Sequence, residues 1–338
     1  MERNKICVLK MGGECNLNCT HCHSKKVKYK FTPEIIPFLK NNGFYRITFS
    51  GGEPLMYFDI MKRVCEELGH NFQYKFVTNT TLLTEEMVKF FNDYNFMVCG
   101  SFDGSDGCRS TFPRPRYDLL AKIKRNTLAV TVYEENNNLN KLKKEVDFLI
   151  GENRLNYRQS LAPEFIHQTA DVSENTTTLD TAKRYITQMA PMIENELIAF
   201  MKDDIRSLKK YGTLFKAVMK WWVKKDYKGL RCVNERVIPM SIDGRFLACP
   251  YGTYFVGDIK SGIDWDAIDA LTPKKCKVCP IQDVCKGACW VNKTNQECYI
   301  ARTMNKWLNK LVANKNAAEK LQTAIDLHLV EQRRIDFN

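Results

Sequence analysis

The sequence predicts an α/β protein built on a parallel sheet. In the first half of the chain, short β-rich runs alternate with amphipathic helical patterns. Helical crossovers between successive strands imply parallel pairing. Polar and cysteine-rich segments directly follow several of the expected strands, as they do in enzymes of this class. The sheet is either an open doubly wound sheet or a partial barrel, and periodicity does not distinguish the two.

The expected strands are short, apolar and rich in β-branched or aromatic residues. They are Lys5–Leu9, Tyr45–Ser50, Tyr74–Thr78, Phe96–Phe102, Leu128–Val132 and Leu155–Ser160. The expected helices between them are Pro33–Asn41, Asp59–Leu68, Thr84–Tyr94, Tyr117–Arg125 and Leu139–Ile150. Pro33 suits the start of a helix and Gly69 suits the end of one.

The remainder of the chain changes character twice. Thr178–Tyr227 is helical and rich in Lys, Met and Trp, whereas Leu230–Cys298 is dense in cysteine and thin in apolar residues, as in a metal-held domain. A helical tail follows. The expected domains are a barrel over 1–165, a helical linker over 166–229, a cysteine-rich domain over 230–300 and a C-terminal helix over 301–338.

Composition narrows the class of protein. The chain has 338 residues, 14 of them cysteine, and a formal net charge of +12. Without an export signal or a membrane span, we expect a cytoplasmic protein whose cysteines serve metal or redox chemistry rather than disulfides. The basic charge either attracts an acidic partner or only keeps the surface soluble. The sequence has no dense basic tract with interleaved aromatics, so it does not favour nucleic acid as the partner.

Ten cysteines fall into two spaced sets. Cys15, Cys19 and Cys22 form a C-x₃-C-x₂-C loop, which can hold three corners of a 4Fe–4S cluster and leave the fourth iron open. The later set is Cys232, Cys249, Cys276, Cys279, Cys285, Cys289 and Cys298. His21, next to Cys22, is either an aromatic ring for a purine to lie against or a surface loop residue.

The segment from Cys15 to Cys22 resembles the signature of the radical S-adenosylmethionine (radical SAM) superfamily. The resemblance implies a partial (β/α)₆ barrel and a cluster whose open iron is chelated by SAM. One electron then cleaves SAM to methionine and a 5′-deoxyadenosyl radical, which abstracts a hydrogen atom from the substrate.

Three further segments resemble the same superfamily. Gly51, Gly52, Glu53 and Pro54 match its GGEP motif, in which glycines allow close approach of the backbone and the carboxylate accepts from the SAM ammonium. Two more pairs of residues resemble its third-strand and fourth-strand motifs for SAM contacts. They are Thr78 with Asn79 and Ser101 with Asp103. Each of these four residues could instead only terminate a strand or cap a helix.

The later cysteines resemble the SPASM domain of peptide-modifying radical SAM enzymes, and structural zinc is the alternative. The resemblance implies two auxiliary 4Fe–4S clusters, and therefore three in all. Cys276, Cys279, Cys285 and Cys298 would bind one. Cys232, Cys249 and Cys289 would bind the other, with its fourth site open or filled by Asp226, solvent or a substrate thiolate.

Four cysteines remain outside both sets. We expect Cys7 and Cys65 to be buried as small apolar residues. Cys99 and Cys108 lie at or just beyond the end of the fourth strand, and either could donate a hydrogen atom to a substrate radical.

The resemblance implies maturation of a ribosomally made peptide by a thioether or carbon–carbon cross-link or by epimerisation. The alternatives are a sulfatase-maturating enzyme, a radical SAM enzyme acting on a small molecule, and an iron–sulfur electron-transfer protein. Pro250 after Cys249 departs from the sulfatase-maturating pattern, which has Asp there. The expected partners are a peptide substrate with an acidic leader and an electron donor such as flavodoxin or ferredoxin. Because the first cluster loop begins by residue 15, we expect recognition of a leader to fall to a separate leader-binding protein, to this barrel or to neither.

Overall fold

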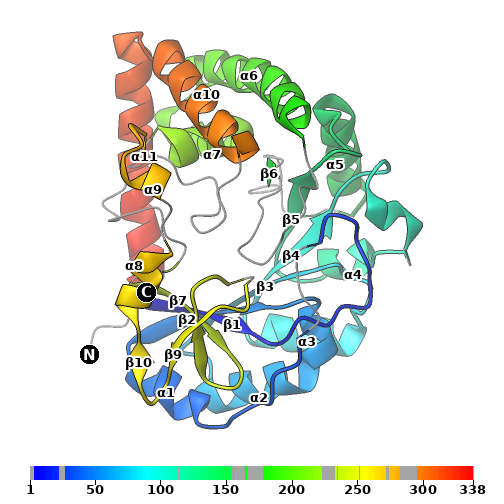
Figure 1. Cartoon of the computed structure of the whole chain (residues 1–338). Coiled ribbons are helices and arrows are strands. Elements are labelled where there is room, and N and C mark those ends of the chain that lie inside the picture. Colours follow the sequence, from blue (N-terminus) through cyan, green and yellow to red (C-terminus); the bar gives the residue numbers. More distant parts are fainter. Residues whose placement is uncertain are drawn as a thin grey trace.

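A computed structural model gives the arrangement of the chain (Figure 1). It describes residues 4–22, 27–112, 114–153, 155, 164–165, 178–222, 233, 235–250, 252–271, 274–281 and 295–337. Of the predicted cluster ligands, Cys232, Cys285 and Cys289 lie outside these residues, as does Asp226.

The core is a parallel sheet, as the sequence predicts. Its strand order is β7-β1-β2-β3-β4-β5-β6, and every neighbouring pair in this run is parallel. The strands are β1 (Lys5–Lys10), β2 (Phe44–Ser50), β3 (Gln73–Thr78), β4 (Met97–Phe102), β5 (Arg125–Val132), β6 (Glu164–Phe165) and β7 (Val237–Ser241). In Figure 1 the sheet curves as part of a barrel, which settles the choice between the two predicted α/β arrangements.

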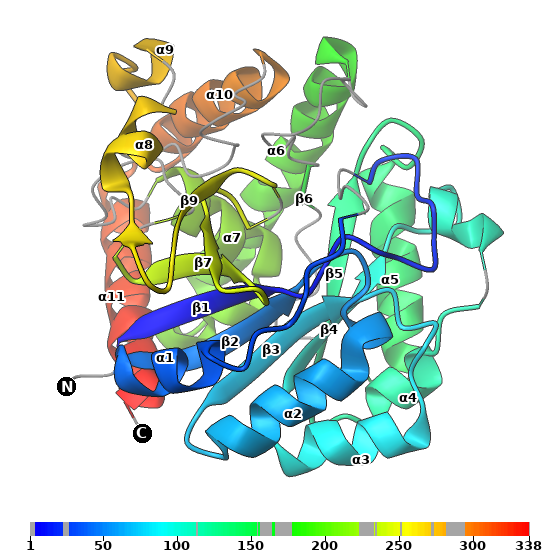
Figure 2. The same cartoon turned by 60° about the horizontal axis from the view of Figure 1, so that its bottom comes forward.

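Side-chain alternation divides the sheet into two faces. Leu9, Phe49 and Phe76 are at most 1% exposed and belong to the core beneath the helices. Their neighbours along the strands, such as Thr48 and Lys75, are only half-buried and point to the inner face. The outer face is covered by α1 (Ile35–Asn41), α2 (Phe58–Leu68), α3 (Glu85–Asp93), α4 (Tyr117–Ala121) and α5 (Leu139–Asn153), as Figure 2 shows.

A second group of helices packs together away from the outer face (Figure 1). It comprises α6 (Leu179–Lys202), the 3₁₀ helix η4 (Ile205–Lys210), α7 (Gly212–Trp221), α10 (Asn295–Leu311) and α11 (Lys315–Phe337). The helical tail expected after Cys298 consists of two helices, because the side chain of Asn314 accepts from the amides of Asn316 and Ala317 and starts α11.

The cysteine-rich segment is tied to the barrel through its first strand. β7 pairs with β1 in parallel, and an antiparallel series then continues through β8 (Arg245–Leu247), β9 (Phe255–Asp258) and β10 (Gly262–Ile263). Gly244, in the β7–β8 turn, has a φ of +85°, a conformation that favours glycine. The short helices α8 (Trp265–Ala270) and α9 (Lys274–Lys277) follow.

Two predicted elements differ from the structure. The helix predicted over Tyr117–Arg125 is too long, because α4 ends at Ala121 and Arg125 already pairs with Met97 of β4. The strand predicted over Leu155–Ser160 lies outside the described residues apart from Leu155, and the strand that pairs with β5 is Glu164–Phe165. In the described part of the chain, no helix combines the length and the apolar character that crossing a membrane requires.

Candidate functional site at the carboxyl ends of the strands

The loop that carries Cys15, Cys19 and Cys22 starts as an extension of the parallel sheet. Beyond the last residue of β1, the amide of Met11 donates to Ser50 O at 2.8 Å, and Gly52 N donates to Gly12 O at 3.1 Å. Glu53 N then donates to Glu14 O at 2.8 Å. These bonds fix the start of the cysteine loop against the GGEP segment.

Gly51 and Gly52 allow this close approach of two backbones. A Cβ atom at Gly51 would lie 2.6 Å from Gly12 O, and one at Gly52 would lie 2.6 Å from Gly13 O. Both distances are far below van der Waals contact, and the obstacle in each case is backbone. The sequence predicts that the two glycines allow close approach of a ligand. The structure shows that they also allow close approach of the cysteine loop.

The Glu53 carboxylate joins the ends of β2 and β3. It is 1% exposed and accepts from the Thr78 hydroxyl at 2.8 Å, from Asn79 N at 2.8 Å and from Leu55 N at 3.1 Å. The last bond caps the 3₁₀ helix η1 (Pro54–Tyr57), in which Pro54 takes the first position. Burial raises the pKa of Glu53, although the three donors oppose that rise. A carboxylate has about four acceptor positions, so one remains for a further donor.

Asn79 connects this carboxylate to the cysteine loop. Its side-chain amide donates to Asn16 Oδ1 at 2.9 Å and to Cys15 Sγ at 3.8 Å, while its backbone amide binds Glu53. The next residue, Thr80, has a φ of +66° although it is β-branched. Such a backbone conformation is strained for threonine and is typical of functional loops.

The three cysteines of the loop fit a metal cluster. Burial raises the pKa of Cys15, and the negative charges of Glu53 and Cys22 add to this rise. The charge of Cys22 also contributes to the raised pKa of Cys19. Thiols that repel one another as thiolates are suited to binding cations. Leu17 N donates to Cys15 Sγ at 3.4 Å, a type of contact that tunes cluster sulfurs.

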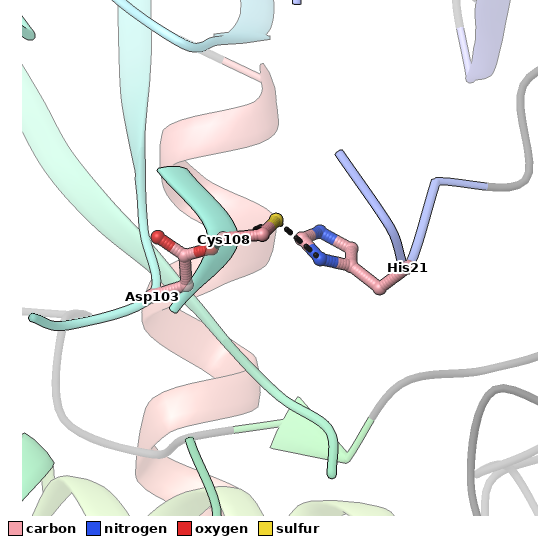
Figure 3. A group of neighbouring side chains, drawn as sticks. All are labelled: His21, Asp103 and Cys108. Atoms are coloured by element: carbon pink, nitrogen blue, oxygen red, sulfur yellow. Dashed lines mark hydrogen bonds between the residues drawn. The ribbon is translucent and has the colours of Figure 1, made fainter. Parts of the chain in front are cut away.

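The side chain of His21 contacts residues that follow β4 and β5. The ring stacks on Tyr133 with centroids 4.2 Å apart, and Nδ1 lies 3.4 Å from Cys108 Sγ (Figure 3). His21 is 7% exposed, so the alternative of a surface loop residue is wrong. The expected contact of this ring with a purine stays a prediction.

Asp103 anchors the other side of this group. Its carboxylate is 2% exposed, accepts from Tyr133 Oη at 2.7 Å and lies 3.4 Å from Arg109 Nη1. Burial raises the pKa of Asp103, with Arg109 and Tyr133 acting in the opposite direction. The thiols of Cys19 and Cys108 are hydrogen-bonded to each other. This bond is the main cause that lowers the pKa of Cys108, and it raises the pKa of Cys19.

His21, Asp103 and Cys108 lie close enough to share a metal ion, since their ligand atoms are all within 4.8 Å of one another (Figure 3). Arg109 argues against a cation there. Its Nη2 is 3.4 Å from His21 Nε2, and its Nη1 is 3.4 Å from Asp103 Oδ2, so a guanidinium already neutralises the carboxylate. The group is therefore a hydrogen-bonded network around Arg109.

Tyr133 holds this network to β5. Its hydroxyl donates to Asp103 Oδ2 at 2.7 Å and accepts from Cys108 N at 2.7 Å. We expect Tyr133→Phe to lower the free energy of unfolding by about 1–3 kcal/mol, because it leaves a buried acceptor and a buried donor without this partner. Chemical denaturation measures the change. Tyr94→Phe is the control, since no described residue hydrogen-bonds to the Tyr94 hydroxyl; an equal effect of both variants would contradict the role of Tyr133.

The two predicted hydrogen donors occupy different places. Cys108 begins the 3₁₀ helix η2 (Cys108–Thr111) and is half-buried beside His21. Cys99 is 6% exposed within β4, and the charges of Lys75 and Lys216 act on it, so it belongs to the inner face of the sheet. Ser101 is half-buried, and its carbonyl accepts from Tyr117 Oη at 2.8 Å. Cys7 and Cys65 are fully buried, as predicted.

The described cysteines of the later set are Cys249, Cys276, Cys279 and Cys298. Cys249 is 5% exposed just after β8, and Gly252 N donates to its carbonyl at 3.2 Å. Cys279 follows α9 and accepts from Arg302 Nη2 at 3.7 Å. Arg302 lies one helical turn after Cys298 on α10. Among the described cysteines, none is in a disulfide.

Sequence reasoning missed Asn16, Arg109 and Tyr133. Asn16 lies inside the cysteine loop and contacts Asn79, 63 positions away. Arg109 and Tyr133 reach His21 and Asp103 from separate elements. Asn16 is adjacent to Cys15 and Arg109 to Cys108, and this nearness in the sequence could have drawn attention to both.

The fold and the site define a partial α/β barrel with a thiol-rich cofactor site at the carboxyl ends of its strands. Residues 9–134 match the model of the Radical SAM superfamily, which makes this part of the chain similar to radical SAM domains. An uncharacterised protein of Methanocaldococcus jannaschii is 28% identical over 167 residues, which are 43% of this chain and 58% of that protein. The chain thus spans less than two thirds of this relative.

Solved structures share the fold over nearly the whole chain. The structure described as native anSMEcpe with bound AdoMet and Cp18Cys peptide has a TM-score of 0.63 at 16% identity, and the match covers 96% of this chain and 99% of that one. Streptococcus suis SuiB bound to precursor peptide SuiA has a TM-score of 0.56 at 16% identity, covering 86% of this chain and 74% of that one.

Proposed function

We propose that this protein is a radical SAM enzyme that modifies a ribosomally made peptide. One observation carries the proposal: the cysteine loop, Glu53 and Asn79 are joined by hydrogen bonds at one edge of the barrel. This arrangement combines three thiols with a buried carboxylate that has an acceptor position left. Radical SAM chemistry needs both, the thiols for a cluster and the carboxylate for an ammonium group.

In this proposal Cys15, Cys19 and Cys22 hold a 4Fe–4S cluster, and Gly51–Pro54 with Thr78 and Asn79 hold SAM. A cluster and SAM bound there would supply one-electron reductive cleavage of SAM and, through it, abstraction of a hydrogen atom from a carbon of the substrate, with methionine and 5′-deoxyadenosine as co-products. Of the two candidate hydrogen donors, Cys108 lies beside Cys19 and His21 at the site, whereas Cys99 is buried within β4.

The later cysteines hold two auxiliary 4Fe–4S clusters in this proposal. Cys276, Cys279, Cys285 and Cys298 hold one, and Cys232, Cys249 and Cys289 hold the other. The buried positions of Cys249 and Cys276 support this assignment. An external donor such as flavodoxin or ferredoxin supplies the electrons in this proposal. Thiolate ligands need a reducing compartment, which suits the cytoplasm.

A peptide is the proposed substrate because two proteins with this fold have been solved with peptides, one with Cp18Cys and the other with its precursor SuiA. The basic charge of the chain, +12, suits a peptide with acidic residues.

Release of 5′-deoxyadenosine tests the proposed chemistry. Anaerobically reconstituted and reduced protein, supplied with SAM, is expected to form it, and deuterated candidate peptides are expected to transfer deuterium to it. Mass spectrometry measures both the amount of 5′-deoxyadenosine and the deuterium that it carries. Protein that carries its full set of clusters but forms no 5′-deoxyadenosine would instead be an electron-transfer protein.

A further inference from the structure

A pocket of about 570 Å³ lies beside the network around Arg109, between the end of β4, α4 and α5. The two helices that flank this α4–α5 pocket are neighbours on the outer face of the sheet (Figure 2). Its walls are largely aromatic: Phe102, Phe112, Tyr117 and Phe148 line it. Phe148 is 68% exposed, which is unusual for so large an apolar side chain. The volume is typical of ligand sites.

The charge that this pocket offers is positive. Arg114 and Lys144 line it, both are exposed, and neither forms an ion pair with any residue that the structure describes. Its two carboxylates already have partners, since Glu145 accepts from Ser105 N at 3.0 Å and Asp103 accepts from Tyr133. An occupant therefore meets cations at the rim and aromatic rings inside.

Arg109 links the pocket to the site. It lines the pocket and contacts Asp103 and His21 through its two terminal nitrogens. Its Nε is buried without a hydrogen-bond acceptor among the described residues, and its Nη1 has only the carboxylate of Asp103, 3.4 Å away. Buried donors of this kind are costly unless an acceptor reaches them, and a ligand carboxylate would do so.

We propose that the α4–α5 pocket binds a segment of the peptide substrate in which an aromatic or aliphatic side chain lies beside acidic residues. The inference rests on the proposed function. The apolar side chain packs against Phe148 and its neighbours, and the carboxylates bind Arg114, Lys144 and Arg109. A chain segment suits the pocket better than a free small molecule, because Phe148, Arg114 and Lys144 are exposed and let the occupant continue beyond the rim.

Calorimetric titration of the cluster-loaded, full-length protein tests this site. The probe is the peptide acetyl-Glu-Phe-Leu-Glu-amide, and acetyl-Lys-Phe-Leu-Lys-amide has the same apolar residues with the opposite charge. We expect the acidic probe to bind and the double variant Arg114→Glu/Lys144→Glu to weaken it at least about tenfold. The same double variant should gain affinity for the lysine probe. Phe148→Ser should also weaken the acidic probe.

Lys40→Glu with Lys89→Glu is the matched control, because it makes the same change of charge at exposed positions on α1 and α3. Three outcomes overturn the inference: equal affinity for the two probes, acidic-probe affinity that Arg114→Glu/Lys144→Glu leaves unchanged, or binding of free 4-phenylbutyrate as tight as that of the acidic probe. SAM cleavage without peptide is measured on the same samples. Absence of SAM cleavage counts against the proposed chemistry alone. Acidic-probe affinity that is the same in the wild type and in Arg114→Glu/Lys144→Glu counts against the pocket alone.

Discussion

Replacement of Cys19 by alanine is expected to abolish formation of 5′-deoxyadenosine and to remove about four iron atoms per chain. Cys19 is the middle cysteine of the C-x₃-C-x₂-C loop and a cluster ligand in the proposed function, and its thiol also hydrogen-bonds to Cys108. Two remaining thiolates cannot hold a cubane cluster at three corners. Iron determination and mass spectrometry of the nucleoside measure the two effects on anaerobically reconstituted protein.

Cys65→Ala is the control for this experiment. Cys65 is a fully buried residue of α2 that packs in the hydrophobic core and belongs to neither cysteine set. Its replacement should leave iron content and SAM cleavage unchanged. Iron that stays at the wild-type level in Cys19→Ala, or 5′-deoxyadenosine formed at the wild-type rate, would show that this loop does not hold the cluster.

The sequence was sufficient to predict the parallel sheet and the edge at which the site forms. Each motif residue follows a strand by a few positions, and parallel strands bring their carboxyl ends to the same edge. Cys15, Glu53, Thr78 and Asn79 could therefore be placed together without knowledge of any side-chain contact. The hydrogen bonds from Asn79 to Glu53 and to the cysteine loop follow from this geometry.

Contacts between distant segments could not be predicted in the same way. Tyr133 reaches Asp103 across 30 positions, and Arg109 reaches His21 across 88. Neither pair has a local pattern, because each contact depends on how β4, β5 and the cysteine loop pack. The parallel pairing of β7 with β1 was hidden for a similar reason: a five-residue strand in a cysteine-rich region does not reveal its partner.

Replacement of Glu53 by glutamine should weaken both the site and the fold. The carboxylate accepts from Leu55 N, Thr78 and Asn79 N. Glutamine has one acceptor oxygen, and its NH₂ group would face a donor. We expect the free energy of unfolding to fall by about 1–3 kcal/mol. Loss of a charged acceptor should raise the SAM dissociation constant of cluster-loaded protein about 10- to 100-fold.

The stability deficit of Glu53→Gln should depend on pH. Burial raises the pKa of Glu53 in the folded protein. Its contribution to stability is therefore complete below the ordinary pKa of a glutamate and is lost as the pH rises through the raised value. The variant lacks this titration, so its deficit should be largest in acid and should shrink towards neutral pH. Denaturation of the cluster-free protein at several pH values measures this change.

Glu67→Gln is the matched control for Glu53→Gln. Glu67 pairs with Arg63 on the exposed side of α2, so its replacement should change stability by less than about 0.5 kcal/mol at any pH. If Glu53→Gln binds SAM as tightly as the wild type, the carboxylate only supports the loops. If its deficit instead grows as the pH rises, Glu53 is stabilised as an anion in the fold, and burial does not dominate its ionisation.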